Sequence, residues 1–320
     1  MTGRIVITRS LTAAVMEEAQ RLPGELVVLG EAPPERSALL DAVANASAIL
    51  SQLTERIDDE VLAAAGQGLR IVANGAAGVD NVDLEAAARR GVVVSNTPGV
   101  LDDATADLAL ALILATTRRV VEADRFIRGG SSWIWGPQEW IGLQLSAGAT
   151  LGIVGLGRIG MAVARRAHAF GAGIVATGSR ATGAEAAALG VEAVTLDELF
   201  ARADIVTLHC PLTAETEGMV DTSRLASMRR GSYLINTGRG PLVDEEALAD
   251  ALDSGHVAGA GLDVHEHEPR VNERLRGSDR VVLLPHIGSA GAATRDAMGR
   301  LAVRNIAEVL AGRDPVTPVR

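Results

Sequence analysis

The sequence contains no lysine, so arginine supplies every positively charged side chain other than histidine. Its 320 residues include 40 acidic and 30 basic ones, and the formal net charge is −10. Binding to nucleic acid or to an anionic membrane requires a basic surface. The composition therefore argues against both kinds of partner.

Cysteine and long apolar runs are scarce as well. Cys210 is the only cysteine, which rules out an intrachain disulfide and fits a reducing, cytoplasmic compartment. The longest apolar run, LALALILA at 108–115, is shorter than the ~20 residues that cross a bilayer. We therefore expect no membrane segment.

Short β-branched runs alternate with alanine-rich helical stretches along the whole chain. The first series of expected strands comprises 4–9, 25–29, 47–50, 69–74 and 91–96, and a second series begins at 150. We also expect a long helix from Asp102 to the Gly129–Gly130 pair, and a last helix at Ala293–Leu310. Strand–helix alternation predicts the α/β class with parallel sheets, and the length predicts two domains.

The segment LGIVGLGRIG carries three glycines in the G-x-G-x-x-G spacing, Gly155, Gly157 and Gly160. It follows an apolar strand and opens a helical run, which is the context that dinucleotide binding requires. The glycines permit the tight turn, the approach of the pyrophosphate and the packing of helix on strand. The alternative is a glycine-rich turn without a ligand.

The segment GLDVHEHEP, 261–269, raises the question of a metal site. Its spacing matches no helical zinc motif, and no other cluster of histidine or cysteine accompanies it. Instead, it follows a strand, as do the segments that present Arg239 and His286. Ligands bind at the carboxyl edge of an open parallel sheet, so Arg239, one carboxylate of this segment and His286 are expected to converge there without a metal.

Seven motifs in this order resemble the D-isomer-specific 2-hydroxyacid dehydrogenase family, most closely its glyoxylate/hydroxypyruvate reductases. They are NGAAGVDNVD, TPGVLDDATADLAL, GIVGLGRIG, HCPLTAETEGMV, INTGRGPLVDEEAL, AGLDVHEHEP and LLPHIGSA. The resemblance implies a flavodoxin-like substrate-binding domain of residues 1–98 plus 288–320. It also implies an inserted Rossmann-type dinucleotide-binding domain, 99–287, with a dimerisation arm at 118–148.

The resemblance also implies reduction of a small 2-oxo acid, with Arg239, Glu268 and His286 as the catalytic residues. Arg239 can hold the substrate carboxylate in a fork, and His286 can donate the proton. Glu268 favours the imidazolium form of His286. Alternatives are a 3-phosphoglycerate or D-lactate type of dehydrogenase, or a dinucleotide-sensing protein that resembles a corepressor.

We assign further residues to the ligands. Cofactor contacts are expected at Gly155, Leu156, Gly157, Arg158, Ile159, Gly160, Ser179, Arg180, Thr182, Thr105, Cys210, Pro211, Thr216, Thr237, Gly238, Asp263 and Gly288. Substrate contacts are expected at Leu53, Ala77, Gly78, Ser289 and Trp140, besides Arg239 and His286. Asp263 has a second interpretation as a turn residue and Leu53 as a buried loop leucine. For His265 we expect packing or the surface, and for Glu266 and His267 solvent.

The second strand of the dinucleotide domain ends in IVATGSRAT, without the acidic residue typical of NAD-binding proteins. Arginine attracts a 2′-phosphate, so Arg180 with Ser179 and Thr182 predicts NADP(H) as the preferred cofactor, with NAD(H) possible. The alternative is a polar turn whose arginine points to solvent.

Four of the seven aromatic residues fall in the arm: Phe126, Trp133, Trp135 and Trp140. Interface cores favour such residues, so the arm predicts a homodimer. By the resemblance, one arm tryptophan enters the partner's substrate pocket, and Trp140 is the provisional choice. The alternative is that these rings cap their own domain.

Overall fold

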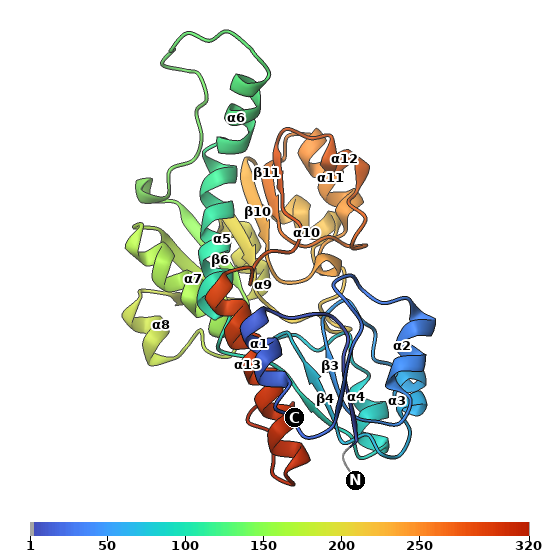
Figure 1. Ribbon diagram of the computed structural model, residues 1–320. Coiled ribbons are helices and arrows are strands. Elements are labelled where there is room, and N and C mark those ends of the chain that lie inside the picture. Colours follow the sequence, from blue (N-terminus) through green and yellow to red (C-terminus); the bar gives the residue numbers. More distant parts are fainter. Residues whose placement is uncertain (1–2, 320) are drawn as a thin grey trace. The chain divides into compact units, whose positions relative to one another are not determined.

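A computed structural model of the chain describes residues 3–319 (Figure 1). The chain separates into two compact units. The first unit comprises the N-terminal segment through Leu101 together with the segment from Ser289 onward, and the second unit comprises Asp102–Gly288. Both units are α/β folds whose strands are all parallel, which confirms the predicted fold class. In the described residues, no helix combines the length and apolar character needed to span a membrane.

The first unit is a five-stranded sheet in the order β2-β1-β3-β4-β5, which is the flavodoxin-like order. Its strands are β1 (Arg4–Ile7), β2 (Glu25–Val28), β3 (Ala46–Ser51), β4 (Ile71–Asn74) and β5 (Val93–Ser95). Its helices are α1 (Ala13–Ala19), α2 (Arg36–Val43), α3 (Asp59–Ala65), α4 (Leu84–Arg89) and α13 (Ala292–Leu310). One core packs α2, α3 and α4 on the sheet, and another packs α1 and α13. The last helix begins one residue before its predicted start and ends where expected.

The second unit is a seven-stranded sheet in the order β12-β11-β10-β9-β6-β7-β8. The strands are β6 (Thr150–Val154), β7 (Gly173–Thr177), β8 (Glu192–Ala193), β9 (Ile205–Leu208), β10 (Ser232–Asn236), β11 (Val257–Leu262) and β12 (Val281–Leu283). The helices are α5 (Asp102–Thr117), α6 (Val120–Arg128), α7 (Arg158–Ala169), α8 (Ala184–Ala188), α9 (Leu196–Arg202), α10 (Thr222–Ser227), α11 (Glu245–Asp253) and α12 (Glu273–Arg276). Short 3-10 turns occupy Leu145–Ala147 and Gly240–Leu242. Because the strand order reverses between β6 and β9, a ligand crevice is expected at their carboxyl ends.

Side-chain caps fix where several helices begin. The Asp244 carboxylate accepts the Ala247 N–H at 2.9 Å and starts α11, and Asp58 and Asp83 do the same for α3 and α4. Thr195 and Glu198 form a reciprocal capping box at the start of α9. Each cap satisfies an N–H group that has no partner within its helix.

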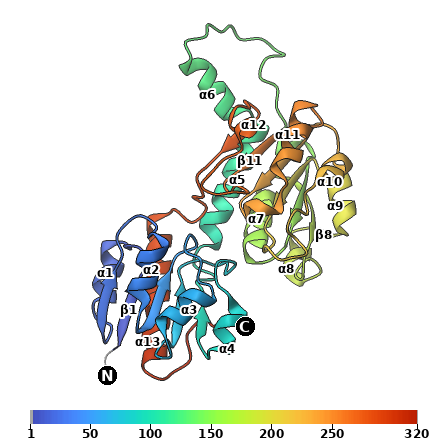
Figure 2. The same cartoon turned by 90° about the vertical axis from the view of Figure 1, so that its right-hand side faces the viewer.

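The single long helix expected after Asp102 is in fact two helices, α5 and α6. The chain breaks at Arg119, whose φ of 55° lies in the left-handed region. The Leu143 N–H donates to the Thr117 carbonyl at 2.9 Å, so the returning chain satisfies the end of α5. The second helix then ends at Arg128, where Gly129 and Gly130 follow as predicted. Figure 2 shows α6 and the loop after it extending away from the larger sheet.

Candidate active site

The glycine motif forms the turn between β6 and α7. Gly155 has a φ of 93°, and a Cβ there would lie 2.6 Å from the Cys210 nitrogen. A Cβ on Gly160 would lie 2.3 Å from the Gly155 carbonyl oxygen, so only glycine lets α7 pack this close to the strand. A Cβ on Gly157 would meet nothing within 4 Å.

The open space at Gly157 lies at the N-terminus of α7. Gly157 is the N-cap of this helix and has no side chain to bond its first N–H groups. Such N–H groups and the helix dipole favour a phosphate. Leu156 is fully buried under the turn, Ile159 is half-buried, and Arg158 is exposed at the first helical position. The residues therefore fit the pyrophosphate of a dinucleotide.

The carboxyl end of β7 lies beside this turn. Gly178 has a φ of 123°, and a Cβ there would lie 2.7 Å from the Leu156 nitrogen. A side chain at this position would therefore be strained in the present turn. Ser179, Arg180 and Thr182 follow and are all exposed. The Arg180 side chain forms no ion pair within residues 3–319, so its charge is available to a ligand.

The carboxyl end of β10 presents Arg239. The Asn236 amide holds this turn: its Nδ2 donates to the Arg239 carbonyl at 2.8 Å, and its Oδ1 accepts the Gly238 N–H at 3.0 Å. The half-buried guanidinium donates to the Gly238 carbonyl at 2.9 Å. The sequence pattern does not identify Asn236 as a holder of this turn, because nothing in the letters INTGRG distinguishes a side chain that folds back.

His286 and Glu268 come together from the ends of β12 and β11. His286 Nδ1 lies 3.0 Å from Glu268 Oε2, and both side chains are partly exposed. Burial raises the pKa of Glu268, but the hydrogen bond and charge of His286 and the His265 N–H outweigh it, so this pKa lies below its ordinary value. An ionised carboxylate on Nδ1 leaves Nε2 as the ring atom that can give up a proton.

Asp263 fixes the turn that presents His286. Its two carboxylate oxygens accept the N–H groups of Ile287 and Gly288, each at 2.7 Å, and its carbonyl accepts the His286 N–H at 2.8 Å. Burial raises the pKa of Asp263 despite these hydrogen bonds. His286 has a φ of 55°, a left-handed conformation that the three bonds hold in place. This turn-holding function matches the second interpretation of Asp263 and leaves its predicted cofactor contact a prediction.

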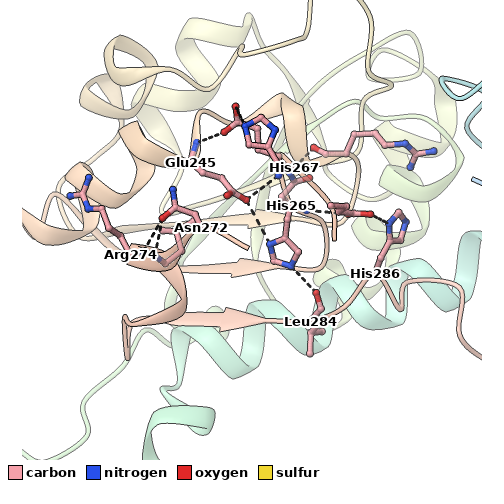
Figure 3. A network of polar contacts seen from close by, with 12 residues as sticks. Glu245, His265, His267, Asn272, Arg274, Leu284 and His286 are labelled. Carbon is pink, nitrogen blue, oxygen red and sulfur yellow. Dashed lines mark hydrogen bonds and ion pairs between the residues drawn. The ribbon is translucent and has the colours of Figure 1, made fainter. Parts of the chain in front are cut away.

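The two histidines and two glutamates of 265–268 do not form a metal site. Within residues 3–319, no group of three or more His, Cys, Asp or Glu side chains is arranged to hold a metal ion. His265 is buried, whereas the His267 side chain is 66% exposed. Glu266 is only partly solvated, because its Oε2 accepts the Glu245 N–H at 3.2 Å. Figure 3 shows this polar network around His265.

The remaining predicted cofactor residues of the second unit lie near the carboxyl ends of the strands of the seven-stranded sheet. Thr105 of α5 is buried beside Gly288, since a Cβ on Gly288 would lie 3.4 Å from the Thr105 methyl group. After β9, Cys210 is half-buried, Pro211 is exposed, and Thr216 donates to the Pro211 carbonyl at 2.8 Å. Thr237 is buried with its hydroxyl 3.4 Å from His209 Nδ1, and Gly238 follows it. Burial lowers the pKa of His209 to about 4.

Four of the predicted substrate residues belong to the first unit. Leu53 follows β3 and is half-buried, and Ala77 and Gly78 lie in the loop after β4. The Asn81 amide joins these two loops by donating to the Gln52 and Glu55 carbonyls, each at 3.0 Å. Ser289 is the first residue of the C-terminal segment of this unit.

The fifth predicted substrate residue, Trp140, lies in the second unit and packs against its own arm. Its ring centroid is 5.1 Å from that of Phe126 in an edge-on arrangement, and the Arg119 guanidinium lies 4.9 Å from the ring centroid. By contrast, Trp133 and Trp135 are 63% and 77% exposed. The alternative that arm aromatics cap their own domain therefore describes Trp140 but not these two.

Comparisons with known proteins identify the family of the chain. The family described as "D-isomer specific 2-hydroxyacid dehydrogenase, NAD binding domain" matches residues 110–288. A glyoxylate reductase of Thermococcus kodakarensis is 45% identical over 325 residues, covering 100% of this chain and 96% of the relative. A glyoxylate reductase of Korarchaeum cryptofilum is 43% identical over 98% of this chain and 95% of its own length.

Solved structures give the same result. A protein from Thermus thermophilus superimposes with a TM-score of 0.92 at 44% identity and covers 99% of this chain and 100% of its own. An NADPH-dependent glyoxylate/hydroxypyruvate reductase from Sinorhizobium meliloti, in complex with NADP and malonate, superimposes with a TM-score of 0.85 at 35% identity, covering 100% and 97% of the two chains. The chain therefore belongs to the D-isomer-specific 2-hydroxyacid dehydrogenase family and is an NAD(P)-dependent oxidoreductase.

Proposed function

We propose that the protein reduces a small 2-oxo acid, glyoxylate or hydroxypyruvate, to the D-2-hydroxy acid. The observation that carries the proposal is the Glu268–His286 pair, at 3.0 Å, on the same sheet edge as the glycine turn. Relatives named glyoxylate reductase, at 43–47% identity over most of the chain, support the substrate class.

Arg239 and His286 have separate tasks in this reaction. When bound, the nicotinamide supplies the hydride. Arg239 binds the substrate carboxylate, and a guanidinium fork fixes the orientation of the ketone beside it. His286 donates the proton from Nε2 to the ketone oxygen as negative charge develops there. The predicted substrate contacts at Leu53, Ala77, Gly78 and Ser289 stay predictions.

Glu268 acts on His286 and not on the substrate in this proposal. Its Oε2 lies 3.0 Å from Nδ1, so it orients the ring and fixes which ring nitrogen faces the substrate. The other oxygen, Oε1, accepts the His265 N–H at 3.1 Å, which fixes the plane of the carboxylate. The low pKa of Glu268 keeps it ionised through the neutral range.

We further propose NADPH as the preferred reductant, with NADH as the weaker one. The exposed Arg180, beside the hydroxyls of Ser179 and Thr182, supports binding of a 2′-phosphate. Gly178 supports it too, because no carboxylate stands at the end of β7 to repel a 2′-phosphate.

One experiment tests both proposals. Initial rates are measured for glyoxylate, hydroxypyruvate, pyruvate and 3-phosphohydroxypyruvate, each with NADPH and with NADH. We expect the highest kcat/KM for one of the first two acids with NADPH. Turnover of none of the acids would contradict the proposed reaction, and a higher kcat/KM with NADH would contradict only the cofactor preference.

The arm supports a homodimer. Its exposed apolar side chains are Val120, Ile127, Trp133, Ile134, Trp135 and Ile141. Several large exposed apolar side chains within one segment are typical of an interface. If the arm forms the dimer, Trp133 and Trp135 have more surface to offer a partner than the provisional choice, Trp140. Sedimentation as a monomer at micromolar concentration would contradict the dimer.

A further inference from the structure

His265 is a buried histidine outside the predicted catalytic set. It is 5% exposed and faces Glu245, which is 4% exposed. Its Nε2 lies 3.0 Å from the Leu284 carbonyl, whereas its Nδ1 lies 3.6 Å from Glu245 Oε1 and has no hydrogen-bond partner among the described residues (Figure 3). Buried polar atoms are normally satisfied, so this arrangement calls for an explanation.

The backbone and ring of His265 together contact all three segments that carry the catalytic residues. Its N–H donates to Glu268 Oε1 at 3.1 Å, on the carboxylate whose other oxygen meets His286. A Cβ on Gly240 would lie 1.9 Å from the His265 carbonyl oxygen, so the residue after Arg239 lies directly against it. Its ring bonds Leu284, two residues before His286.

The charges around the ring explain the unpaired nitrogen. Two carboxylates act on it: Glu245, at the start of α11, and Glu268. Glu266 is engaged with Glu245. The Glu266 N–H donates to Glu245 Oε1 at 3.1 Å, and the Glu266 Oε2 accepts the Glu245 N–H. The segment after β12 offers only the Leu284 carbonyl. If Nε2 keeps a proton for that carbonyl, a neutral ring turns the lone pair of Nδ1 toward Glu245, whereas a protonated ring turns an N–H toward it.

We propose that His265, protonated against Glu245, is a positioning residue that holds the Glu268–His286 pair in register with the Arg239 turn. The inference rests on the proposed reduction, because turnover is one of its readouts. Glu245 raises the pKa of His265 above 6.5 despite burial, and the Leu284 carbonyl adds to this effect. The ring therefore keeps its proton to a higher pH than an ordinary histidine, and the reduction rate falls as that proton is lost.

Two variants and one control test the proposal on the full chain with saturating NADPH. His265→Phe keeps an aromatic ring but removes both nitrogens. His265→Gln keeps an amide donor for Leu284 and removes the titration. His267→Gln changes an exposed histidine two residues away. For each protein, kcat and KM for glyoxylate are measured from about pH 5.5 to 9.5, together with the Kd for NADPH from fluorescence.

We expect His265→Phe to lower kcat roughly tenfold at pH 7. A misplacement of catalytic groups by about 1 Å can lower the rate on the order of a hundredfold, and the shift expected here is smaller. Its Kd for NADPH should stay within about twofold of the wild type. His265→Gln should keep more of kcat and lack one ionisation of the wild-type profile. His267→Gln should match the wild type. A His265→Phe enzyme with the wild-type kcat and pH profile would overturn the proposal.

A second readout does not depend on the reaction. In histidine NMR spectra, the resonance missing from His265→Gln should titrate above 6.5 in the wild type and move lower in Glu245→Gln. A resonance that titrates at or below 6.5 in the wild type would overturn the proposal even in an active enzyme. If the wild type reduces no 2-oxo acid but this resonance behaves as expected, the proposed reaction fails and the charged His265–Glu245 pair stands.

Discussion

The two halves of the carboxyl edge of the larger sheet are built in different ways. After β6 and β7, the chain offers backbone: Gly155, Gly160 and Gly178 sit where a Cβ would overlap a neighbouring main-chain atom. After β10, β11 and β12, it offers side chains, and two histidine–carboxylate pairs lie within one peptide network. In the proposed reaction, fixed N–H groups recognise a ligand in one half, and titratable groups carry out the chemistry in the other.

The two histidines at the edge after β10, β11 and β12, His286 and His265, differ in exposure. Both face a glutamate, but His286 reaches solvent while His265 is buried. A proton donor must reach the substrate, whereas a positioning group needs only fixed partners. The difference in exposure therefore separates the two functions better than residue type does. The predictions below test the two halves in turn, from the largest effect to the smallest.

His286→Asn should give the largest loss. Removal of a general acid typically costs about 10²- to 10⁴-fold, so kcat for glyoxylate should fall in that range. The Kd for NADPH should be unchanged, because the glycine turn is untouched. His267→Asn is the matched control, and near-normal turnover in His286→Asn at neutral pH would show that another group gives the proton.

Alanine substitutions at two glycines should separate ligand binding from folding. A Cβ on Gly160 would lie 2.3 Å from the Gly155 carbonyl, so Gly160→Ala should destabilise the fold by about 1–3 kcal/mol. A Cβ on Gly157 meets nothing, so Gly157→Ala should unfold like the wild type but bind NADPH about tenfold more weakly, which is ~1.4 kcal/mol. Thermal unfolding and NADPH titration check both, and equal affinity in Gly157→Ala would remove the pyrophosphate from this turn.

Arg180→Ala should reduce the preference for NADPH. A hydrogen bond to a charged group contributes about 1.5–3 kcal/mol, so the ratio of kcat/KM for NADPH to that for NADH should fall by at least about tenfold. Arg202→Ala, an arginine paired with Glu192, serves as the control. An unchanged ratio would mean that the Arg180 side chain points to solvent. Gly178→Asp is a poor test, because its Cβ would strain the turn.

Glu245→Gln should have the smallest effect, and the effect should depend on pH. The raised pKa of His265 means that the pair stabilises the folded state below about 6.5 and loses this contribution as pH rises through the folded pKa. The Tm difference from the wild type should therefore be largest near pH 6, on the order of 2–4 °C, and shrink toward pH 9. A difference that grows with pH would contradict the sign of this coupling.

The part of the sheet edge after β6 and β7 was largely predictable from the sequence. The part after β10, β11 and β12 was less so. The glycine turn follows from ten consecutive residues, and the strand series and the last helix follow from local hydrophobic pattern. No fixed spacing links Arg239, Glu268 and His286, so strand ends indicated only an arginine, a carboxylate and a histidine, and the family resemblance supplied the particular set. The short distance between Glu268 and His286 is a finding of the structure.

Other features depend on contacts that no local pattern contains. The break at Arg119 arises where the Leu143 N–H returns to Thr117. The surroundings of His265 come from Glu245, Gly240 and Leu284, three separate segments. Alternating histidine and glutamate letters therefore do not show which neighbour each side chain meets, whereas the fold turns alternate side chains toward different neighbours.

The central claim is that Glu268 acts through His286, and a double-mutant cycle tests it most directly. Rates of glyoxylate reduction are compared for the wild type, Glu268→Gln, His286→Asn and the double variant at saturating NADPH. Residues that act as a unit are strongly non-additive. We expect Glu268→Gln to lower kcat substantially in the wild type but by no more than about threefold in the His286→Asn background. Equal losses in both backgrounds would contradict the account, because Glu268 would then act independently of His286.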